Sequence, residues 1–323
     1  MSLFTEQLKI HRGAAPCLFY PMAGRMGISM SQLLTEPVVQ AEVLTEISRI
    51  KLVSAVIRMT ELWCEAASFG IEWKIYERDF PKLGAPIFSD IGELADLKIP
   101  QIENEVTSPL IEAVRLAAPN LHKPLIVGAT GPYTLCSVLN GSENFMMNCM
   151  LEPDAVHEVL DRLTEYLIEY IRAYKEAGAS GVIFAEPSAS MVSPNMMAEF
   201  SNRYVERIIQ SVQDDTFSLI YHNCGSVNQH LDVISRLDAD AFHFGSQVDL
   251  GRALKIISKD KFVMGNTDPR IFITSSPSDV ENRAAELKNK YQEYSNWIPS
   301  TGCDLSPSCY DGENRQLSGS ICN

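Results

Sequence analysis

From about residue 123 onward, short apolar runs alternate with longer amphipathic segments, and this alternation limits the fold more than any other feature of the chain. Runs such as residues 124–128 and 181–184 have the length of buried strands. Residues 153–177 carry apolar side chains at helical spacing, and Gly178 follows as a helix stop. The alternation therefore predicts parallel βα units.

Eight apolar runs fit this pattern. We predict strands at residues 17–20, 53–59, 124–128, 181–184, 217–220, 241–244, 261–265 and 297–300. Eight βα units in a chain of 323 residues predict a (β/α)8 barrel, and no linker divides it, so we expect a single catalytic barrel domain over residues 1–323. Helical spacing between residues 31 and 69 predicts an N-terminal helical extension, another helix is expected at 195–212, and residues 71–87 predict a hairpin or an irregular excursion.

The charge, the cysteine spacing and the absence of long apolar stretches limit the kind of protein this can be. The net charge is −14 and no basic run interrupts the acidic background, which disfavours binding to nucleic acid. The eight cysteines form no CxxC pair, which favours reduced thiols. Neither a signal-peptide pattern nor an apolar stretch of about 18 residues is present, so we expect a cytoplasmic protein without a membrane span.

Three side chains suited to metal binding follow two of the predicted strands. His222 and Cys224 are two residues apart after the apolar run 217–220, so both point to the same side of an extended segment. Cys303 follows the short apolar run at 297–300. One imidazole and two thiols leave one tetrahedral position of a zinc ion open, which is typical of catalytic rather than structural zinc. The sequence thus predicts a zinc site formed by His222, Cys224 and Cys303.

Around these residues the chain resembles the uroporphyrinogen decarboxylase superfamily, and within it the zinc-dependent cobalamin methyltransferase branch. That branch carries H-x-C followed far downstream by Gly-Cys, matched here by His222, Cys224 and Gly302-Cys303. Supporting matches are residues 186–190 (Glu-Pro-Ser-Ala-Ser), 265–269 (Gly-Asn-Thr-Asp-Pro), and Glu-Ala at 65–66 with Phe-Gly at 69–70. The resemblance covers nearly the whole chain.

Three departures separate the chain from the decarboxylase branch. The Arg-Gln-Ala-Gly-Arg loop of decarboxylases is Pro-Met-Ala-Gly-Arg at residues 21–25, so one of the two arginines is missing. The Pro-Tyr-Thr-Leu stretch at 132–135 continues to Val138 instead of a Tyr, and Gly302-Cys303 stands in the region of a Gly-His-Gly. These changes replace groups that bind acids with groups that bind a metal.

The resemblance implies a reaction and its partners. It implies a methyltransferase that moves a methyl group from methylcobalamin, or from a corrinoid carried by a small separate protein, to a thiol such as coenzyme M. Glu186 is the candidate catalytic residue, and Arg25 and Asp268 are candidates for cofactor binding. Two alternatives stay open: a decarboxylase of a tetrapyrrole or another acid, and a non-catalytic corrinoid-binding subunit stabilised by zinc.

The fourth zinc ligand is not fixed by this pattern. Members of the methyltransferase branch often have an acidic residue shortly before a Val-Asp pair, whereas Val248-Asp249 follows Gly-Ser-Gln at residues 245–247. Water, Glu186, Gln247 and His243 are therefore the candidates.

Overall fold

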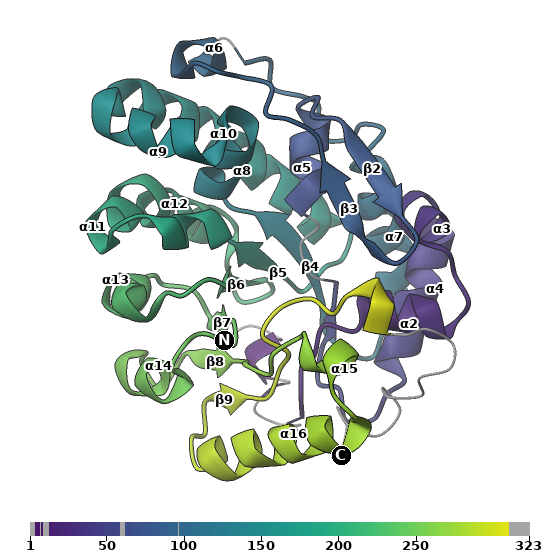
Figure 1. Ribbon diagram of the computed structural model, residues 1–323. Coiled ribbons are helices and arrows are strands. Elements are labelled where there is room, and N and C mark those ends of the chain that lie inside the picture. Colours follow the sequence, from purple (N-terminus) through teal and green to yellow (C-terminus); the bar gives the residue numbers. More distant parts are fainter. Residues whose placement is uncertain (1–3, 7, 9–12, 59–61, 96, 310–323) are drawn as a thin grey trace.

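The structure, a computed structural model, describes residues 4–6, 8, 13–58, 62–95 and 97–309. Seven parallel strands form one curled sheet with helices on its outer side (Figure 1). In spatial order the strands are β1 (Val56–Ile57), β4 (Leu125–Thr130), β5 (Gly181–Ala185), β6 (Ser218–Asn223), β7 (Ala241–Phe244), β8 (Phe262–Met264) and β9 (Trp297–Ile298). The predicted alternation of strands and helices is confirmed.

The N-terminal segment closes the sheet into a barrel. Ala14 forms a parallel bridge with Val53, and the Ser54 N–H donates to the Ala14 carbonyl at 2.9 Å. On the other side, the Ala15 N–H donates to the Pro299 carbonyl at 2.9 Å, just beyond β9. The segment is therefore hydrogen-bonded to both edges of the curled sheet. Together with the strands it gives the predicted (β/α)8 barrel.

The strand predicted at residues 17–20 is wrong, because this run enters the helix α2 (Phe19–Arg25). Residues 19–23 of that helix are all buried. An apolar run of this length suits the buried face of a short helix as well as a strand, and Pro21 is tolerated in a first helical turn. The strand that closes the barrel lies a few residues earlier, where Ala14 and Ala15 give little apolar signal.

Helices surround the barrel and include the predicted N-terminal extension. They are α2, α3 (Met30–Thr35), α4 (Pro37–Ser48), α5 (Leu62–Ser68), α6 (Ile91–Ala95), α7 (Ser108–Ala117), α8 (Pro132–Asn140), α9 (Ser142–Leu151), α10 (Pro153–Glu176), α11 (Pro194–Met197), α12 (Arg203–Val212), α13 (Leu231–Ile234), α14 (Leu250–Ile256), α15 (Ile271–Thr274) and α16 (Pro277–Tyr291). Short 3-10 turns are η1 (Ala118–Asn120), η2 (Pro187–Met191), η4 (Asn228–His230) and η5 (Pro307–Cys309). The helix predicted at 195–212 consists of α11 and α12, joined by the π turn η3 (Ala198–Asn202).

The excursion predicted at residues 71–87 contains a β-hairpin. Strands β2 (Trp73–Tyr76) and β3 (Asp79–Leu83) pair antiparallel. The Trp73 ring stacks on Trp63 of α5 with centroids 4.2 Å apart, which fixes the hairpin to the body of the protein. Among the described residues, no helix combines the length and the apolar character needed to cross a membrane.

The barrel interior is filled by side chains that alternate with outward-facing ones along each strand. A buried cluster separate from the larger core contains inward-facing residues of neighbouring strands, among them Ile57, Ile126, Ile183, Ile220, Ala241, Phe262 and Ile298. Ile183 pairs with Ile220, which in turn pairs with Ala241, so these side chains form a layer across the barrel. The candidate site lies directly next to this layer, toward the carboxyl ends of the strands.

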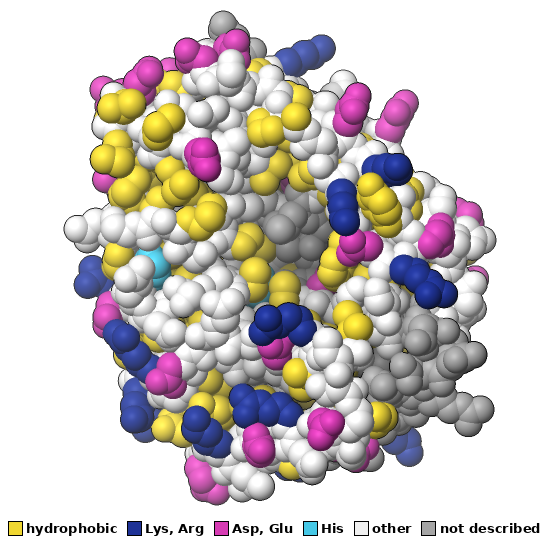
Figure 2. Space-filling model, viewed as in Figure 1, with side chains coloured by type: hydrophobic (Ala, Val, Ile, Leu, Met, Phe, Trp, Pro, Cys, Tyr) yellow, Lys and Arg dark blue, Asp and Glu magenta, His cyan; other side chains and the backbone are white. Residues whose placement is uncertain are grey.

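Large apolar side chains are also exposed on one side of the molecule. Figure 2 shows hydrophobic side chains gathered over α9. Met147, Met150 and Leu151 of α9 and Met191 of η2 are more than half exposed. Because η2 directly follows β5, Met191 lies at the end of the barrel to which the strands direct their carboxyl ends.

Candidate metal centre

The end of strand β6 supplies two of the three predicted ligands, His222 on the strand and Cys224 directly after it, next to the apolar layer inside the barrel. His222 lies two residues beyond Ile220 and therefore points inward as Ile220 does, and Cys224 continues the same alternation. Cys303 follows β9, and its side chain packs against the interior cluster. The carboxyl ends of two strands therefore deliver the three side chains to one end of the barrel.

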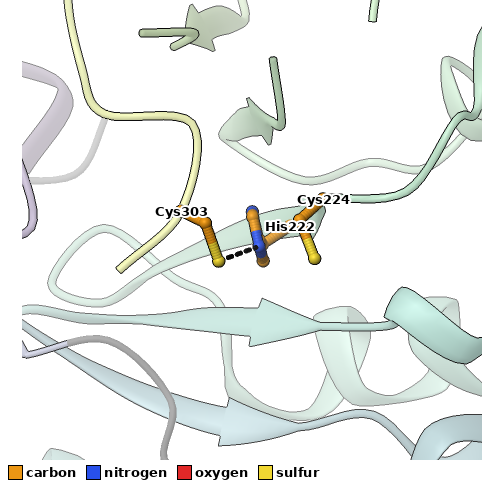
Figure 3. A group of neighbouring side chains, drawn as sticks. All are labelled: His222, Cys224 and Cys303. Atoms are coloured by element: carbon orange, nitrogen blue, oxygen red, sulfur yellow. Dashed lines mark hydrogen bonds between the residues drawn. The ribbon is translucent and has the colours of Figure 1, made fainter. Parts of the chain in front are cut away.

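The three side chains converge (Figure 3). One possible ligand atom from each of His222, Cys224 and Cys303 lies within 4.8 Å of the others. The Cys303 Sγ is 3.8 Å from the His222 Nε2. Ligands of a tetrahedral zinc, with bonds of about 2.0 to 2.3 Å, lie roughly 3.5 Å apart, so small side-chain rotations would complete the set. One imidazole and two sulfurs suit zinc in particular, and the residues present fit this ion.

Asn223 is the last residue of β6 and lies between His222 and Cys224, and its side-chain hydrogen bonds shape the loop that follows the strand. The Asn223 amide donates to the Glu186 carbonyl, and its Oδ1 accepts from the Gly225 N–H at 2.9 Å. These bonds tie the end of β6 to the end of β5 and turn the chain directly after Cys224. The position of the Cys224 side chain is thus set by the backbone.

Two glycines allow the ligand-bearing segments to approach one another closely. A Cβ atom at Gly245 would lie 2.5 Å from the Cys224 carbonyl oxygen and 2.7 Å from its Cα. A Cβ atom at Gly302 would lie 2.9 Å from the Ser246 nitrogen. Only glycine fits at such separations, so the loops after β6, β7 and β9 pack backbone against backbone beside the three ligands.

The two sulfurs do not share their negative charge equally. The Cys303 thiol lowers the pKa of Cys224 more than any other group, although burial raises it. The neighbouring Cys224 in turn raises the pKa of Cys303, to which burial also contributes. Without a cation, one of the pair carries the charge and the other keeps its proton. A cation between them would stabilise both thiolates.

Among the described His, Cys, Asp and Glu residues none adds a fourth ligand to the cluster, and Gln247 stays a candidate. The cluster contains only His222, Cys224 and Cys303 among the His, Cys, Asp and Glu residues that the structure describes. His243 is fully buried and both of its ring nitrogens already have partners, on His222 and on the segment 300–301. A site with three protein ligands leaves one coordination position for a small molecule, as catalytic zinc requires.

Glu186 lies beside this site, but its carboxylate is directed toward α8. It accepts hydrogen bonds from the Tyr133 N–H at 3.1 Å, the Thr134 N–H at 2.8 Å and the Thr134 hydroxyl at 2.6 Å, and from the Ser201 hydroxyl at 3.1 Å. Burial raises the pKa of Glu186 to about 7 although these bonds lower it. The contacts are those of a side chain that caps a helix N-terminus. A catalytic role for Glu186 stays a prediction.

The two predicted cofactor-binding residues are not part of the cluster. Arg25 is exposed in the last turn of α2. Asp268 follows β8 and binds the Arg270 guanidinium, with Oδ2 2.6 Å from Nη2, and this hydrogen bond lowers the pKa of Asp268. Neither residue contacts the three candidate ligands in any of the described hydrogen bonds, and their role in cofactor binding stays a prediction.

Glu65 is buried, although its spacing in the sequence is typical of an exposed residue. The spacing of Glu61 and Glu65 is typical of a solvated helix face, and Glu61 lies outside the described residues. Glu65 is instead completely buried and accepts hydrogen bonds from the Thr130 N–H and hydroxyl. The flanking apolar residues Trp63, Cys64 and Ala66 were the available signal for burial.

A large cavity of the molecule lies away from the ligands. It has a volume of about 710 Å³ and is lined by β9, α16 and the segment 13–16. None of the three candidate ligands lines it. The chemistry of the side chains, rather than the size of a cavity, therefore identifies the candidate site.

Known proteins resemble this chain in sequence. The family model described as uroporphyrinogen decarboxylase (URO-D) matches residues 11–311. A uroporphyrinogen decarboxylase of Coxiella burnetii is 29% identical over 243 residues, which are 71% of this chain and 66%, just under two thirds, of that protein. Methylcobamide:CoM methyltransferase MtbA of Methanosarcina acetivorans is 22% identical over 251 residues, covering 76% of this chain and 72% of that protein.

Solved structures agree on the fold. A methyltransferase from Methanosarcina mazei superposes with a TM-score of 0.80 at 18% identity and covers 94% of this chain and 93% of its own. A B12-independent methionine synthase from Shewanella reaches a TM-score of 0.56 at 14% identity, covering 83% of this chain and 81% of its own. The family model spans nearly all of the chain, and the fold agrees with it. The chain therefore belongs to the uroporphyrinogen decarboxylase family.

Proposed function

We propose that this enzyme is a zinc-dependent methyltransferase that moves a methyl group from a methyl-Co(III) corrinoid to a thiol such as coenzyme M. One observation supports the proposal above all others. His222, Cys224 and Cys303 bring their ligand atoms within 4.8 Å of one another at the carboxyl end of the barrel. A decarboxylase does not need such a group of soft ligands.

The donor set suits activation of a thiol. A free thiol has a pKa of about 8.5 and is a weak nucleophile while protonated. Zinc bound by His222, Cys224 and Cys303 would hold a substrate sulfur as thiolate near neutral pH. Two cysteinates already balance the charge of the cation, so the added thiolate retains electron density on its sulfur.

The methyl transfer itself needs orientation rather than proton transfer. The thiolate sulfur attacks the methyl carbon, the new S–C bond forms, and the C–Co bond breaks with both electrons remaining on cobalt as Co(I). The thiol proton has already left to solvent. The sulfur would need to approach within about 3 to 3.5 Å of the methyl carbon, in line with the C–Co bond. The proposed methyl donor is a small protein that carries the corrinoid. In an assay, free methylcobalamin can take the place of this protein.

Metal analysis gives the first test. We expect about one zinc per purified chain and a large loss of zinc in Cys303→Ala, because that change removes one of three ligands. Cys309→Ala is the matched control, since Cys309 is buried six residues further on but lies outside the ligand cluster. Wild-type protein without zinc, or equal loss of zinc in both variants, would contradict the proposed site.

An activity assay separates the candidate functions. Wild-type protein is mixed with methylcobalamin and a panel of thiols, and Co(I) formation is followed by absorbance. A zinc-dependent rise with one thiol supports methyl transfer. Zinc and corrinoid binding without turnover of any thiol indicates a corrinoid-binding subunit, and turnover of uroporphyrinogen by metal-free protein indicates a decarboxylase.

A further inference from the structure

Behind the three candidate ligands, His243 connects the two segments that carry them. His243 lies on β7, between β6 and β9 in the order of the barrel, and it pairs in register with His222. Its side chain is completely buried. One ring nitrogen, Nδ1, lies 2.8 Å from the Nδ1 of His222, and the other, Nε2, lies 2.7 Å from the Thr301 carbonyl oxygen. Thr301 is two residues before Cys303.

The partners of these nitrogens fix the direction of each hydrogen bond. A carbonyl oxygen only accepts, so the His243 Nε2 carries the proton and donates to Thr301. In a neutral imidazole the other nitrogen then accepts, and the His243 Nδ1 accepts from the His222 Nδ1–H. The His243 carbonyl, 3.0 Å from the same His222 Nδ1, independently requires that nitrogen to be the donor.

This arrangement leaves the His222 Nε2 without a proton, and that nitrogen lies 3.8 Å from the Cys303 Sγ. Ser300 extends the chain of bonds: its hydroxyl donates to the Ala15 carbonyl at 2.7 Å and so accepts from the His243 Nε2 at 3.1 Å. A continuous, one-directional series of hydrogen bonds therefore runs from the His222 ring to the N-terminal segment. It holds β6 and the segment before Cys303 at a fixed separation.

We propose that His243 is a positioning residue of the metal centre, which holds the His222 ring in the Nδ1–H tautomer and fixes the Cys303 segment relative to it. Ligating histidines commonly donate their second ring nitrogen to a carbonyl or carboxylate, and loss of such a partner weakens metal binding about 10- to 100-fold. An imidazole that connects two ligand-bearing strands performs both tasks with one side chain. The proposal rests on the metal site of the proposed function but not on methyl transfer.

The test compares two buried histidines. His230 is also completely buried, and its Nε2 lies 2.7 Å from the Val192 carbonyl oxygen, but it contacts none of the candidate ligands. Zinc affinity is measured by competition with a chelator, and the absorption spectrum of the Co(II)-substituted protein reports ligand geometry. We expect His243→Leu to bind zinc about 10- to 100-fold more weakly and to change the Co(II) spectrum. His230→Leu should leave both unchanged.

A polar pair covers the case in which the leucine variants do not fold. His243→Asn keeps an acceptor near His222 but does not reach Thr301, so a smaller loss of zinc affinity is expected than for His243→Leu, with His230→Asn unchanged. Wild-type affinity and spectrum in the folded His243 variants would overturn the inference, as would equal losses in the His230 variants. If wild-type protein binds no metal, both the inference and the proposed function fail. Weaker zinc binding in His243 variants without methyl transfer in wild type would overturn the function alone.

Discussion

The buried carboxyl group of Glu65 shows how burial and hydrogen bonds together set a pKa in the interior. Its Oε1 accepts from the Thr130 N–H at 2.8 Å, and its Oε2 accepts from the Thr130 hydroxyl and the Cys64 thiol at 3.1 and 3.0 Å. Burial raises the pKa of Glu65, and these hydrogen bonds compensate only in part. The folded protein therefore retains the Glu65 proton at pH values at which the unfolded chain has lost it.

This shift predicts a pH dependence of stability. An unperturbed Glu titrates near pH 4.3, so the free energy of unfolding should fall as the pH rises from there through the raised pKa of the folded state. Glu65→Gln removes this titration. In urea unfolding at a series of pH values, we expect the stability of Glu65→Gln relative to wild type to increase with pH. The exposed Glu143→Gln should run parallel to wild type, and parallel curves for Glu65→Gln would contradict the expectation.

The candidate ligands show which residue-level features a sequence contains. The His-x-Cys spacing directly after a predicted strand was enough to place His222 and Cys224 on one side, because alternation along an extended segment is a local property. Contacts across strands are not local. Neither the bonds of His243 to His222 and Thr301 nor the approach of Gly245 to Cys224 follows from spacing along the chain.

At the scale of elements, the N-terminus of α8 depends on a side chain from the end of β5. Glu186 accepts from two backbone N–H groups in the first turn of α8. Gly131, which precedes that helix, leaves the space through which Glu186 reaches it, because a Cβ atom there would lie 2.2 Å from the Glu186 Cδ. An interaction between elements therefore replaces the usual cap from the helix's own residues.

Gly131→Ala should break this contact. The added methyl group cannot be accommodated without moving Glu186, and overpacking of this kind costs about 1 to 3 kcal/mol of unfolding free energy. Gly251→Ala in α14 is the control, since its added Cβ would lie 3.3 Å from the Asp249 side chain, which needs to move by only a few tenths of an ångström. Urea denaturation measures both variants. Equal stability of Gly131→Ala and wild type would show that Glu186 has another route to the helix.

The predicted elements differ in accuracy for a physical reason. Strands β4 to β8 lie in the middle of the parallel sheet, are buried on both faces, and appear in the sequence as nearly continuous apolar runs. Ala14 and Ala15 close the barrel through backbone hydrogen bonds, which leave no mark on side-chain type. Phe19 and Tyr20 are apolar enough to predict a strand, but they form the buried face of the helix α2.

At the scale of the whole molecule, closure of the barrel and the candidate metal centre share one segment. Ala15 donates to the Pro299 carbonyl and accepts from the Ser300 hydroxyl. Directly after Ser300, the Thr301 carbonyl accepts from the His243 Nε2, and Cys303 two residues later is a candidate ligand. The hydrogen bonds of Ala15 that close the barrel therefore also hold the segment that leads to Cys303.

Ala15→Pro tests this connection. Proline has no N–H, so the Pro299 carbonyl loses its donor, and we expect a loss of about 1 to 3 kcal/mol in unfolding free energy together with weaker zinc binding. Ser276→Ala, which removes the N-cap of α16, should cost about 1 kcal/mol without changing zinc affinity. Urea denaturation and chelator competition measure the two quantities. Unchanged zinc affinity in a destabilised Ala15→Pro variant would separate barrel closure from the centre.

The close approach of Gly245 to Cys224 has a consequence for redesign. A carboxylate grafted at residue 245, to convert the centre into a sealed four-ligand structural zinc site, would need its first carbon where the Cys224 main chain already lies. The substitution would add one ligand but displace Cys224, which is another. In the proposed zinc centre, residue 245 therefore cannot supply a fourth ligand, and the proposed substrate thiol can take the fourth coordination position.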